Sequence, residues 1–123
     1  ERGHFIVNDD FDLSLSPHLF DLAITSGLLR RLSLNAIARC VASVVKKLAP
    51  GGRFYVSWPE NPDPASFEPI TRPDGSTTYS DREPFHYSYQ TLAAIAETLG
   101  ARAERLPDAS HPRGEAVMVL TRT

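Results

Sequence analysis

The side chains best suited to acid–base or metal chemistry are few and far apart in this chain of 123 residues. The sequence has one cysteine, Cys40, and four histidines, which are His4, His18, His86 and His111. None of them stands at the H-x-x-x-H or C-x-x-C spacing that brings two ligands to one metal ion, so we expect no metal site. His86 is a candidate general base, because the pKa of a histidine lies near neutrality.

A second group of candidates combines an arginine with aromatic side chains near the ends of predicted elements. Arg31 could hold an anionic acceptor through its guanidinium, or it could be a solvated helix residue. His86 and Tyr87 follow a long loop, and they could cover a site or anchor that loop on the core. Trp58 ends a predicted strand and could face an acceptor pocket, although the core is the favoured alternative. Only His86 and Arg31 are candidates for a catalytic role.

The overall composition is that of a globular protein with no general attraction to polyanions. Hydrophobic residues make up 41% of the chain and charged residues 23%, and the formal net charge is -2. This charge favours neither nucleic acid nor a membrane surface, and no apolar run approaches the roughly 18 residues of a membrane-spanning helix. A single cysteine allows no intrachain disulfide, and the first residues lack the pattern of a secretory signal. We therefore expect a cytoplasmic protein without a nucleic-acid or membrane partner, and a buried, inert thiol at Cys40.

The elements that must position these residues begin with a strand and a helix. Residues 19–25, "LFDLAIT", form a short apolar run typical of a strand that is covered on both faces. Residues 33–48 carry apolar side chains at helical spacing and have two lysines in the last turn, where cations oppose the helix dipole. Ser33 or Asn35 can cap the start of this helix.

A tight turn then leads into a second strand. The Pro-Gly-Gly turn at residues 50–52 ends the helix, and both glycines can adopt the left-handed conformations that reverse the chain. Residues 53–58, "RFYVSW", are aromatic and β-branched, as is typical of a strand. Strand, helix, turn and strand make a βαβ unit, which predicts a parallel sheet.

The remaining segments are read in the same way. "HFIVNDD", residues 4–10, is typical of a short strand that enters a loop. Residues 59–84 are Pro-rich and too long for an ordinary loop, so they are either a functional lid or a mobile insertion. Residues 88–100 predict a helix that begins at a serine cap and ends at a glycine. Residues 101–109 and 115–123 predict two strands whose short connection favours an antiparallel hairpin.

This order of elements resembles the C-terminal half of class I S-adenosylmethionine-dependent methyltransferases. Four stretches carry the resemblance, namely "FDLAITSGLLRRL", "LAPGGRFYVS", "PFHYSYQTLAAIAETLGA" and "SHPRGEAVMVLTR". The resemblance begins at the family's third strand and covers nearly the whole chain. It implies an α/β, Rossmann-like three-layer half-sheet in which parallel strands end in an antiparallel hairpin. It also implies that the N-terminal half with the cofactor loop is absent, so that residues 1–123 are the C-terminal portion of a methyltransferase domain.

The resemblance also implies which residues line the site. The carboxylate of Asp9, or that of Asp10, would accept a hydrogen bond from the adenine amino group, and Phe11 or Leu13 would pack on the ring. Residues after the fourth strand of the family would lie near the sulfonium of the cofactor and near the acceptor; these are Thr25, Ser26 and Gly27. The residues expected to bind the acceptor are Arg31, Trp58, His86, Tyr87 and His111.

The function implied is part of a methyl transfer from S-adenosylmethionine to an unidentified acceptor, either a small molecule or a cell-envelope component. The Gly-rich turn and the ribose-binding acid of the family have no counterpart here, so we expect the intact parent to bind the cofactor and this chain alone to be inactive. No catalytic triad is required, because the sulfonium carbon is already electrophilic. The alternative is a non-catalytic interaction module, since a half-domain exposes sheet edges through which it could form a homo-oligomer.

Overall fold

The protein is built on one five-stranded mixed sheet. This computed structural model describes residues 3–6, 19–106 and 115–123. The strands lie in the order β1 (Gly3–Ile6), β2 (Phe20–Thr25), β3 (Leu48–Trp58), β7 (Ala116–Arg122) and β6 (Ala101–Leu106). The pairs β1–β2 and β2–β3 are parallel, whereas β7 is antiparallel to both of its neighbours. The predicted α/β fold, with parallel strands that end in an antiparallel hairpin, is therefore confirmed.

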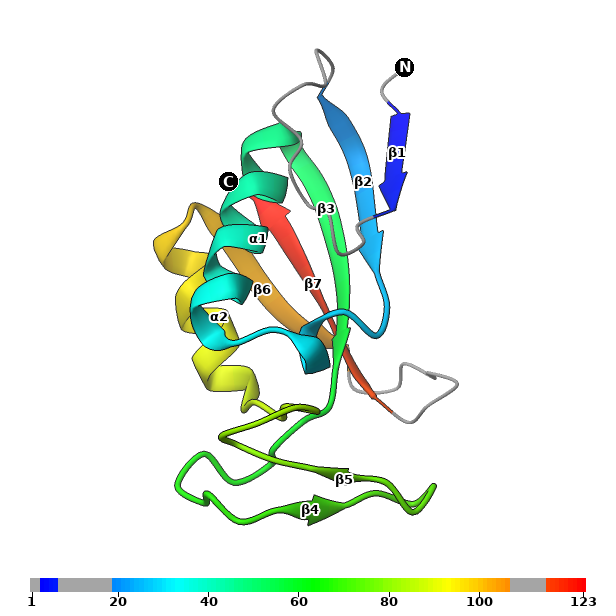
Figure 1. The fold of residues 1–123 in the computed structure, drawn as a ribbon. Coiled ribbons are helices and arrows are strands. Elements are labelled where there is room, and N and C mark those ends of the chain that lie inside the picture. Colours follow the sequence, from blue (N-terminus) through cyan, green and yellow to red (C-terminus); the bar gives the residue numbers. More distant parts are fainter. Residues whose placement is uncertain (1–2, 7–18, 107–114) are drawn as a thin grey trace.

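The helices lie together on one face of this sheet (Figure 1). They are the short 3-10 helix η1 (Leu29–Arg31), α1 (Leu34–Lys47) and α2 (Tyr89–Thr98). The hydroxyl of Ser33 accepts a hydrogen bond from the backbone N–H of Ala36 at the start of α1, at 3.3 Å. Ser88 caps α2 in the same way through the N–H of Thr91, also at 3.3 Å. The predicted helices and their serine caps are thus confirmed.

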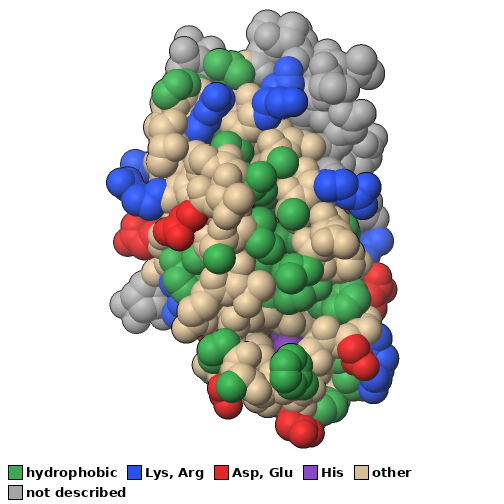
Figure 2. Space-filling model, turned by 90° about the vertical axis from the view of Figure 1, so that its left-hand side faces the viewer, with side chains coloured by type: hydrophobic (Ala, Val, Ile, Leu, Met, Phe, Trp, Pro, Cys, Tyr) green, Lys and Arg blue, Asp and Glu red, His purple; other side chains and the backbone are tan. Residues whose placement is uncertain are grey.

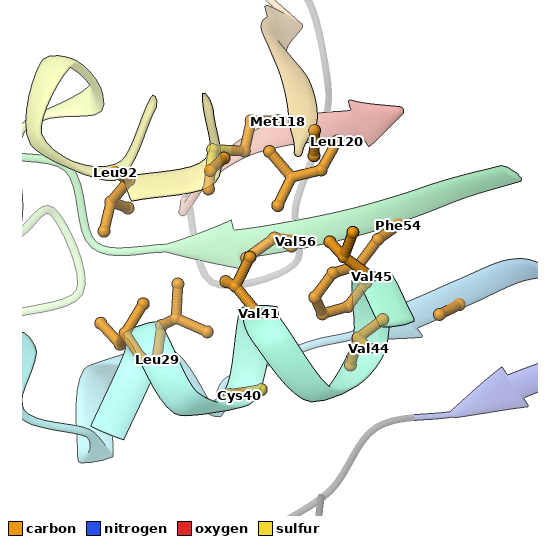
Figure 3. Close-up of a cluster of buried hydrophobic side chains, with 14 of the residues drawn as sticks. Leu29, Cys40, Val41, Val44, Val45, Phe54, Val56, Leu92, Met118 and Leu120 are labelled. Atoms are coloured by element: carbon orange, nitrogen blue, oxygen red, sulfur yellow. The ribbon is translucent and has the colours of Figure 1, made fainter. Parts of the chain in front are cut away.

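The hydrophobic core lies between these helices and the sheet (Figure 3). Phe54, Val56 and Trp58 alternate along β3, and each is 0% exposed. They meet the apolar stripes of both helices, which consist of Ile37, Cys40, Val41, Val44 and Val45 on α1 and Leu92 and Ala96 on α2. Cys40 is buried as predicted, and burial raises the pKa of its thiol to about 12, so it stays protonated at neutral pH.

The opposite face of the sheet carries a different pattern. Ala23 and Thr25 of β2 are buried toward the core, whereas Ile24 between them is 43% exposed. Successive side chains of a strand point to opposite faces, so Ile24 belongs to the face away from the helices. No helix among the described residues covers that face. The described part of the three-layer arrangement thus consists of the sheet and one layer of helices.

In the turn between α1 and β3, only one of the two glycines has the predicted left-handed conformation. Gly51 has a left-handed φ of 80°, but Gly52 has no positive φ. Gly52 is instead required by close packing, because a Cβ there would lie 2.8 Å from the carbonyl oxygen of Ala49 and 3.1 Å from that of Phe20. β3 also begins five residues earlier than predicted, since Leu48 already pairs with Phe20 before the turn.

Residues 59–84 contain regular secondary structure as well as loop segments. They contain a small antiparallel hairpin made of β4 (Ile70–Thr71) and β5 (Thr77–Thr78). Figure 1 shows this hairpin beyond the ends of β2 and β3, on the side toward which both strands run. We call residues 59–87 the insertion.

We predict that Gly52→Ala destabilises the fold more than a change at its neighbour Gly51. The added methyl would press on two backbone carbonyls that cannot move independently, and overpacking of this kind costs about 1–3 kcal/mol. Gly51→Asn is the matched control, since nothing lies within 4 Å of a Cβ there and asparagine tolerates a left-handed φ. Urea denaturation of both variants measures the difference, and equal losses would contradict the packing role of Gly52.

Candidate functional site

The carboxyl ends of β2 and β3 meet at one edge of the sheet. The parallel register places Thr25, the last residue of β2, beside Val56 of β3. The backbone N–H of Gly27 then donates to the hydroxyl of Ser57 at 3.4 Å, which links the two strand ends. Gly27 has a φ of 73°, a conformation that favours glycine. Open α/β sheets bind ligands in the crevice outside the carboxyl ends of their strands, so this edge is the candidate site.

Two polar side chains, those of Thr25 and Ser57, are buried at this edge. Thr25 is 3% exposed, and its hydroxyl has no hydrogen-bond partner among the described residues. Ser57 is equally buried and accepts from Gly27. The structure thus brings the predicted cofactor residues Thr25, Ser26 and Gly27 to the carboxyl edge. The other predicted cofactor residues, Asp9, Asp10 and Phe11, lie outside the described residues, as does the predicted acceptor residue His111.

The insertion is tied to this edge through Tyr87. Its carbonyl oxygen accepts from the indole N–H of Trp58 at 2.8 Å and from the backbone N–H of Asn61 at 2.9 Å. Its phenol donates to the carbonyl oxygen of Leu32 at 2.7 Å. Burial raises the pKa of Tyr87 to about 12, so the phenol remains a donor at neutral pH. In the structure Trp58 is part of the core and Tyr87 anchors the insertion; their predicted contacts with an acceptor stay predictions.

Two further contacts hold the insertion. The backbone N–H of Phe85 donates to the carbonyl oxygen of Arg30 in η1 at 2.7 Å. Glu60 receives two hydrogen bonds from the guanidinium of Arg105 on β6, at 2.9 and 2.6 Å. Paired bonds of this kind are geometrically specific. The insertion is therefore fastened at both ends to the sheet edge.

A buried hydrogen-bonded cluster lies inside the insertion. His86 is 2% exposed, and its Nδ1 lies 3.0 Å from the hydroxyl oxygen of Thr78. The same oxygen accepts from Nε and Nη2 of Arg72, at 3.0 and 2.8 Å. The Thr78 hydroxyl and Nδ1 of His86 thus share one buried hydrogen bond, whose direction depends on the tautomer of the ring. Nε2 of His86 has no partner among the described residues.

This arrangement bears on the expected role of His86. Burial, followed by the positive charge of Arg72, lowers the pKa of His86 and keeps the ring neutral. Nδ1 is engaged with the hydroxyl of Thr78, and Nε2 is buried without a partner among the described residues. Action of His86 as a general base stays a prediction.

A small pocket opens between the insertion and the sheet edge. It has a volume of about 70 Å³ and is lined by Arg30, Arg72, Asp74, Ser76, Thr78 and Glu115, among others. The carboxylate of Glu115 lies 4.0 Å from the guanidinium of Arg30, and its side chain is only 5% exposed. Arg31, the predicted anion-binding residue, is exposed and does not line the pocket, whereas its neighbour Arg30 does. No sequence pattern pointed to Arg72 or Glu115, because neither stands in a motif.

The surface and the side-chain clusters add two observations. Figure 2 shows one side of the molecule, where both basic and acidic side chains surround a central hydrophobic area. Among the residues with defined placement, no group of three or more His, Cys, Asp or Glu side chains could hold a metal ion. No helix in the described part of the chain is both long and apolar enough to cross a membrane.

Comparison with known proteins shows a likeness in structure. No family model matches the chain, and no curated protein sequence matches it. The solved structure of the sugar N-methyltransferase KedS8 from a Streptoalloteichus species matches 94% of the chain with a TM-score of 0.62 and 17% identity. CalS10, an amino pentose methyltransferase from Micromonospora echinaspora solved with SAM bound, matches 93% with a TM-score of 0.67 and 13% identity.

A further match comes from Streptomyces venezuelae. DesVI covers 94% of the chain with a TM-score of 0.61 and 18% identity. The chain spans only 60%, 63% and 64% of the lengths of KedS8, CalS10 and DesVI. The chain thus has the Rossmann-like fold of S-adenosylmethionine-dependent methyltransferases, over part of their length.

We predict that Tyr87→Phe loosens the insertion without unfolding the sheet. The change leaves the carbonyl of Leu32 without its donor, which costs about 1–2 kcal/mol. Amide hydrogen exchange should speed up within residues 59–87 more than in α1. Tyr79→Phe is the matched control, because the phenol of Tyr79 makes no hydrogen bond within the described part of the chain. Similar exchange in both variants would show that the Tyr87 phenol does not anchor the insertion.

A pH dependence follows from the neutral state of His86. Its pKa in the folded protein is below the ordinary value of 6.5, so the unfolded chain binds more protons as the pH falls. The free energy of unfolding should therefore decrease below about pH 6.5 and continue to fall until the folded-state pKa is passed. His86→Gln should flatten this slope below about pH 6.5, as measured by urea denaturation at each pH. An unchanged slope would assign the titration to other groups.

Proposed function

We propose that this chain is the C-terminal portion of an S-adenosylmethionine-dependent methyltransferase that acts on a small molecule. The observation that carries the proposal is the fold match at TM-score 0.67 to CalS10, a methyltransferase solved with SAM bound. The carboxyl edge of β2 and β3 adds to it, because that edge combines a left-handed Gly27 with the buried hydroxyls of Thr25 and Ser57. Ligands of open α/β sheets bind at such an edge.

The residues present suit a supporting part of the cofactor site. The left-handed Gly27 lets the backbone approach a ligand closely, and the unpartnered hydroxyl of Thr25 can bond a polar group of it. When bound, S-adenosylmethionine supplies an electrophilic methyl group. What remains for the protein is to position the acceptor in line with that group and to exclude water. The insertion is suited to this task, since it is fastened beside the strand ends by Tyr87 and Phe85.

The acceptor class is proposed from the named activities of the structural neighbours. KedS8 is described as a sugar N-methyltransferase, CalS10 as an amino pentose methyltransferase and MmcR as a mitomycin 7-O-methyltransferase. We propose that the acceptor here is likewise a small molecule with an amino or hydroxyl group. Residues 59–84 act as the lid over it, and the chain needs its parent's leading strands for activity.

The alternative function is a non-catalytic interaction module that associates through its sheet. It is favoured by one observation, the exposure of Ile24 on a face that no described helix covers. A hydrophobic residue on an open sheet face can mark an association surface. Cofactor binding separates the two functions.

We predict that S-adenosylhomocysteine raises the melting temperature of the parent protein clearly and that of this chain little. A ligand at about 100 times its Kd stabilises a binder by about 2.7 kcal/mol, which corresponds to several degrees in a domain of this size. The chain alone should shift less, because the resemblance places the main cofactor contacts in the absent leading strands. Differential scanning calorimetry measures both shifts.

A matched pair of glycine variants sharpens this experiment in the parent protein. Gly27→Val at the site and Gly75→Val in the hairpin turn strain the backbone alike, since both glycines have a positive φ. Only Gly27→Val should reduce the ligand-induced shift. Equal shifts for chain and parent would refute the claim that the main contacts lie outside this chain. No shift in the parent would favour the interaction module.

A further inference from the structure

We propose that the pocket between the insertion and the sheet edge binds one anionic group, a carboxylate or a phosphate, of the methyl acceptor. The proposal rests on the proposed function, because it assigns the class of that function's substrate. It depends on Arg30, Arg72 and Glu115, which come from separate segments of the chain and line one pocket.

The first support is the position of the pocket. Arg30 belongs to η1, three residues beyond Gly27 at the end of β2. Glu115 directly precedes β7, whose first residue Ala116 pairs with Trp58 at the end of β3. Arg72 belongs to the insertion, which Phe85 and Tyr87 attach to the same edge. The pocket is therefore at the edge where the acceptor would lie, on its insertion side.

The second support is the balance of charge. The pocket places two guanidinium groups, those of Arg30 and Arg72, against one buried carboxylate, that of Glu115. Asp74 also lines the pocket, but it is exposed, and its carboxylate accepts from the N–H and hydroxyl of Ser76 at 2.9 and 2.6 Å. The charge of Asp74 acts on both arginines, but water screens an exposed carboxylate. The less exposed wall of the pocket therefore carries two guanidiniums and one carboxylate, and a singly charged anion would complete the balance.

The third support is the number of free donors. Arg72 uses Nε and Nη2 on Thr78, and Nη1 makes no hydrogen bond among the described residues. The guanidinium of Arg30 reaches Glu115 only at 4.0 Å, which is longer than a hydrogen bond. Partial burial lowers the pKa of Arg72, although Glu115 and other acids oppose this. A half-buried guanidinium with spare N–H groups is suited to a carboxylate or phosphate oxygen.

The size of the pocket limits what it can hold. Its volume of about 70 Å³ is well below the roughly 300 Å³ or more of a pocket for a whole small molecule. It matches a single carboxylate or phosphate group instead. An ammonium group is the less suitable occupant, since it would add a third positive charge beside two guanidiniums. The remainder of the acceptor would extend from the pocket toward the strand ends.

The experiment is an NMR titration of this chain with inorganic phosphate and, separately, with acetate, at constant ionic strength in chloride. The side-chain Nε resonances of Arg72 and Arg30 should shift and saturate with at least one of the two anions. The anion that binds more tightly identifies the group. Arg72→Gln should weaken binding at least about tenfold, since it removes a charge and its donors. Arg39→Gln, at an exposed position on α1, is the matched control and should leave binding unchanged.

The results of this titration can support or overturn the proposed anion site. Shifts that do not saturate, or that are equal at Arg39 and Arg72, would indicate a general salt effect and overturn it. If Arg72→Gln fails to fold by circular dichroism, Arg30→Gln at the more exposed wall of the pocket provides the same test. Arg72→Lys should bind with intermediate affinity, because it keeps the charge but loses the forked geometry. The titration uses no cofactor, so its result is independent of whether S-adenosylhomocysteine stabilises the parent.

Discussion

The burial of one face of β3 is the constraint on which the other features depend. β3 is the central strand and pairs with β2 on one side and β7 on the other, and its Phe54, Val56 and Trp58 are completely enclosed by the helices. Burying a large apolar side chain contributes about 1.5–3 kcal/mol, so these positions fix the register of the sheet. Trp58 is the last of them, and its indole N–H bonds the carbonyl of Tyr87. Trp58 directly precedes the insertion and bonds Tyr87 at its end, so the core positions both ends of the insertion.

Much of this fold was predictable because the signals are local. The serine caps, the apolar stripe of α1 and the apolar run of β2 are each encoded within a few residues, and each formed where expected. The neighbours of a strand are not encoded in that way. The resemblance assigns β1 to the family's third strand, which a doubly wound sheet separates from the fourth by its first and second strands. In this chain β1 pairs directly with β2. Which strands pair depends on the sheet edges that are available in the folded protein. The residue pattern of a single strand does not encode this.

Only the part of the candidate site that directly follows a strand could be predicted from the sequence. Residues 25–27 reached the carboxyl edge because any residues after a buried parallel strand do so. Arg30 rather than the predicted Arg31 lines the pocket, because in a 3-10 helix with about three residues per turn a step of one residue turns the side chain to another side. Binding of an anion by Arg31 stays a prediction. Arg72 and Glu115 had no signal, since they come from separate segments that meet only in the folded pocket. Residues 59–84 showed a composition typical of a loop, yet tertiary hydrogen bonds gave them order.

The arrangement separates the two tasks that the proposed function requires. The edge of β2 and β3, which would face the cofactor, is part of the sheet and is held by the core. The pocket that would face the acceptor takes Arg72 and Thr78 from the insertion, which is held to the rest of the protein by the hydrogen bonds and core packing of Tyr87 and by the backbone bond of Phe85. Changes in the insertion can therefore alter the acceptor pocket while the sheet stays intact, as is common for sites built from loops on a rigid scaffold. Under the proposed function, acceptor choice is thus a property of the insertion, and cofactor use is a property of the sheet.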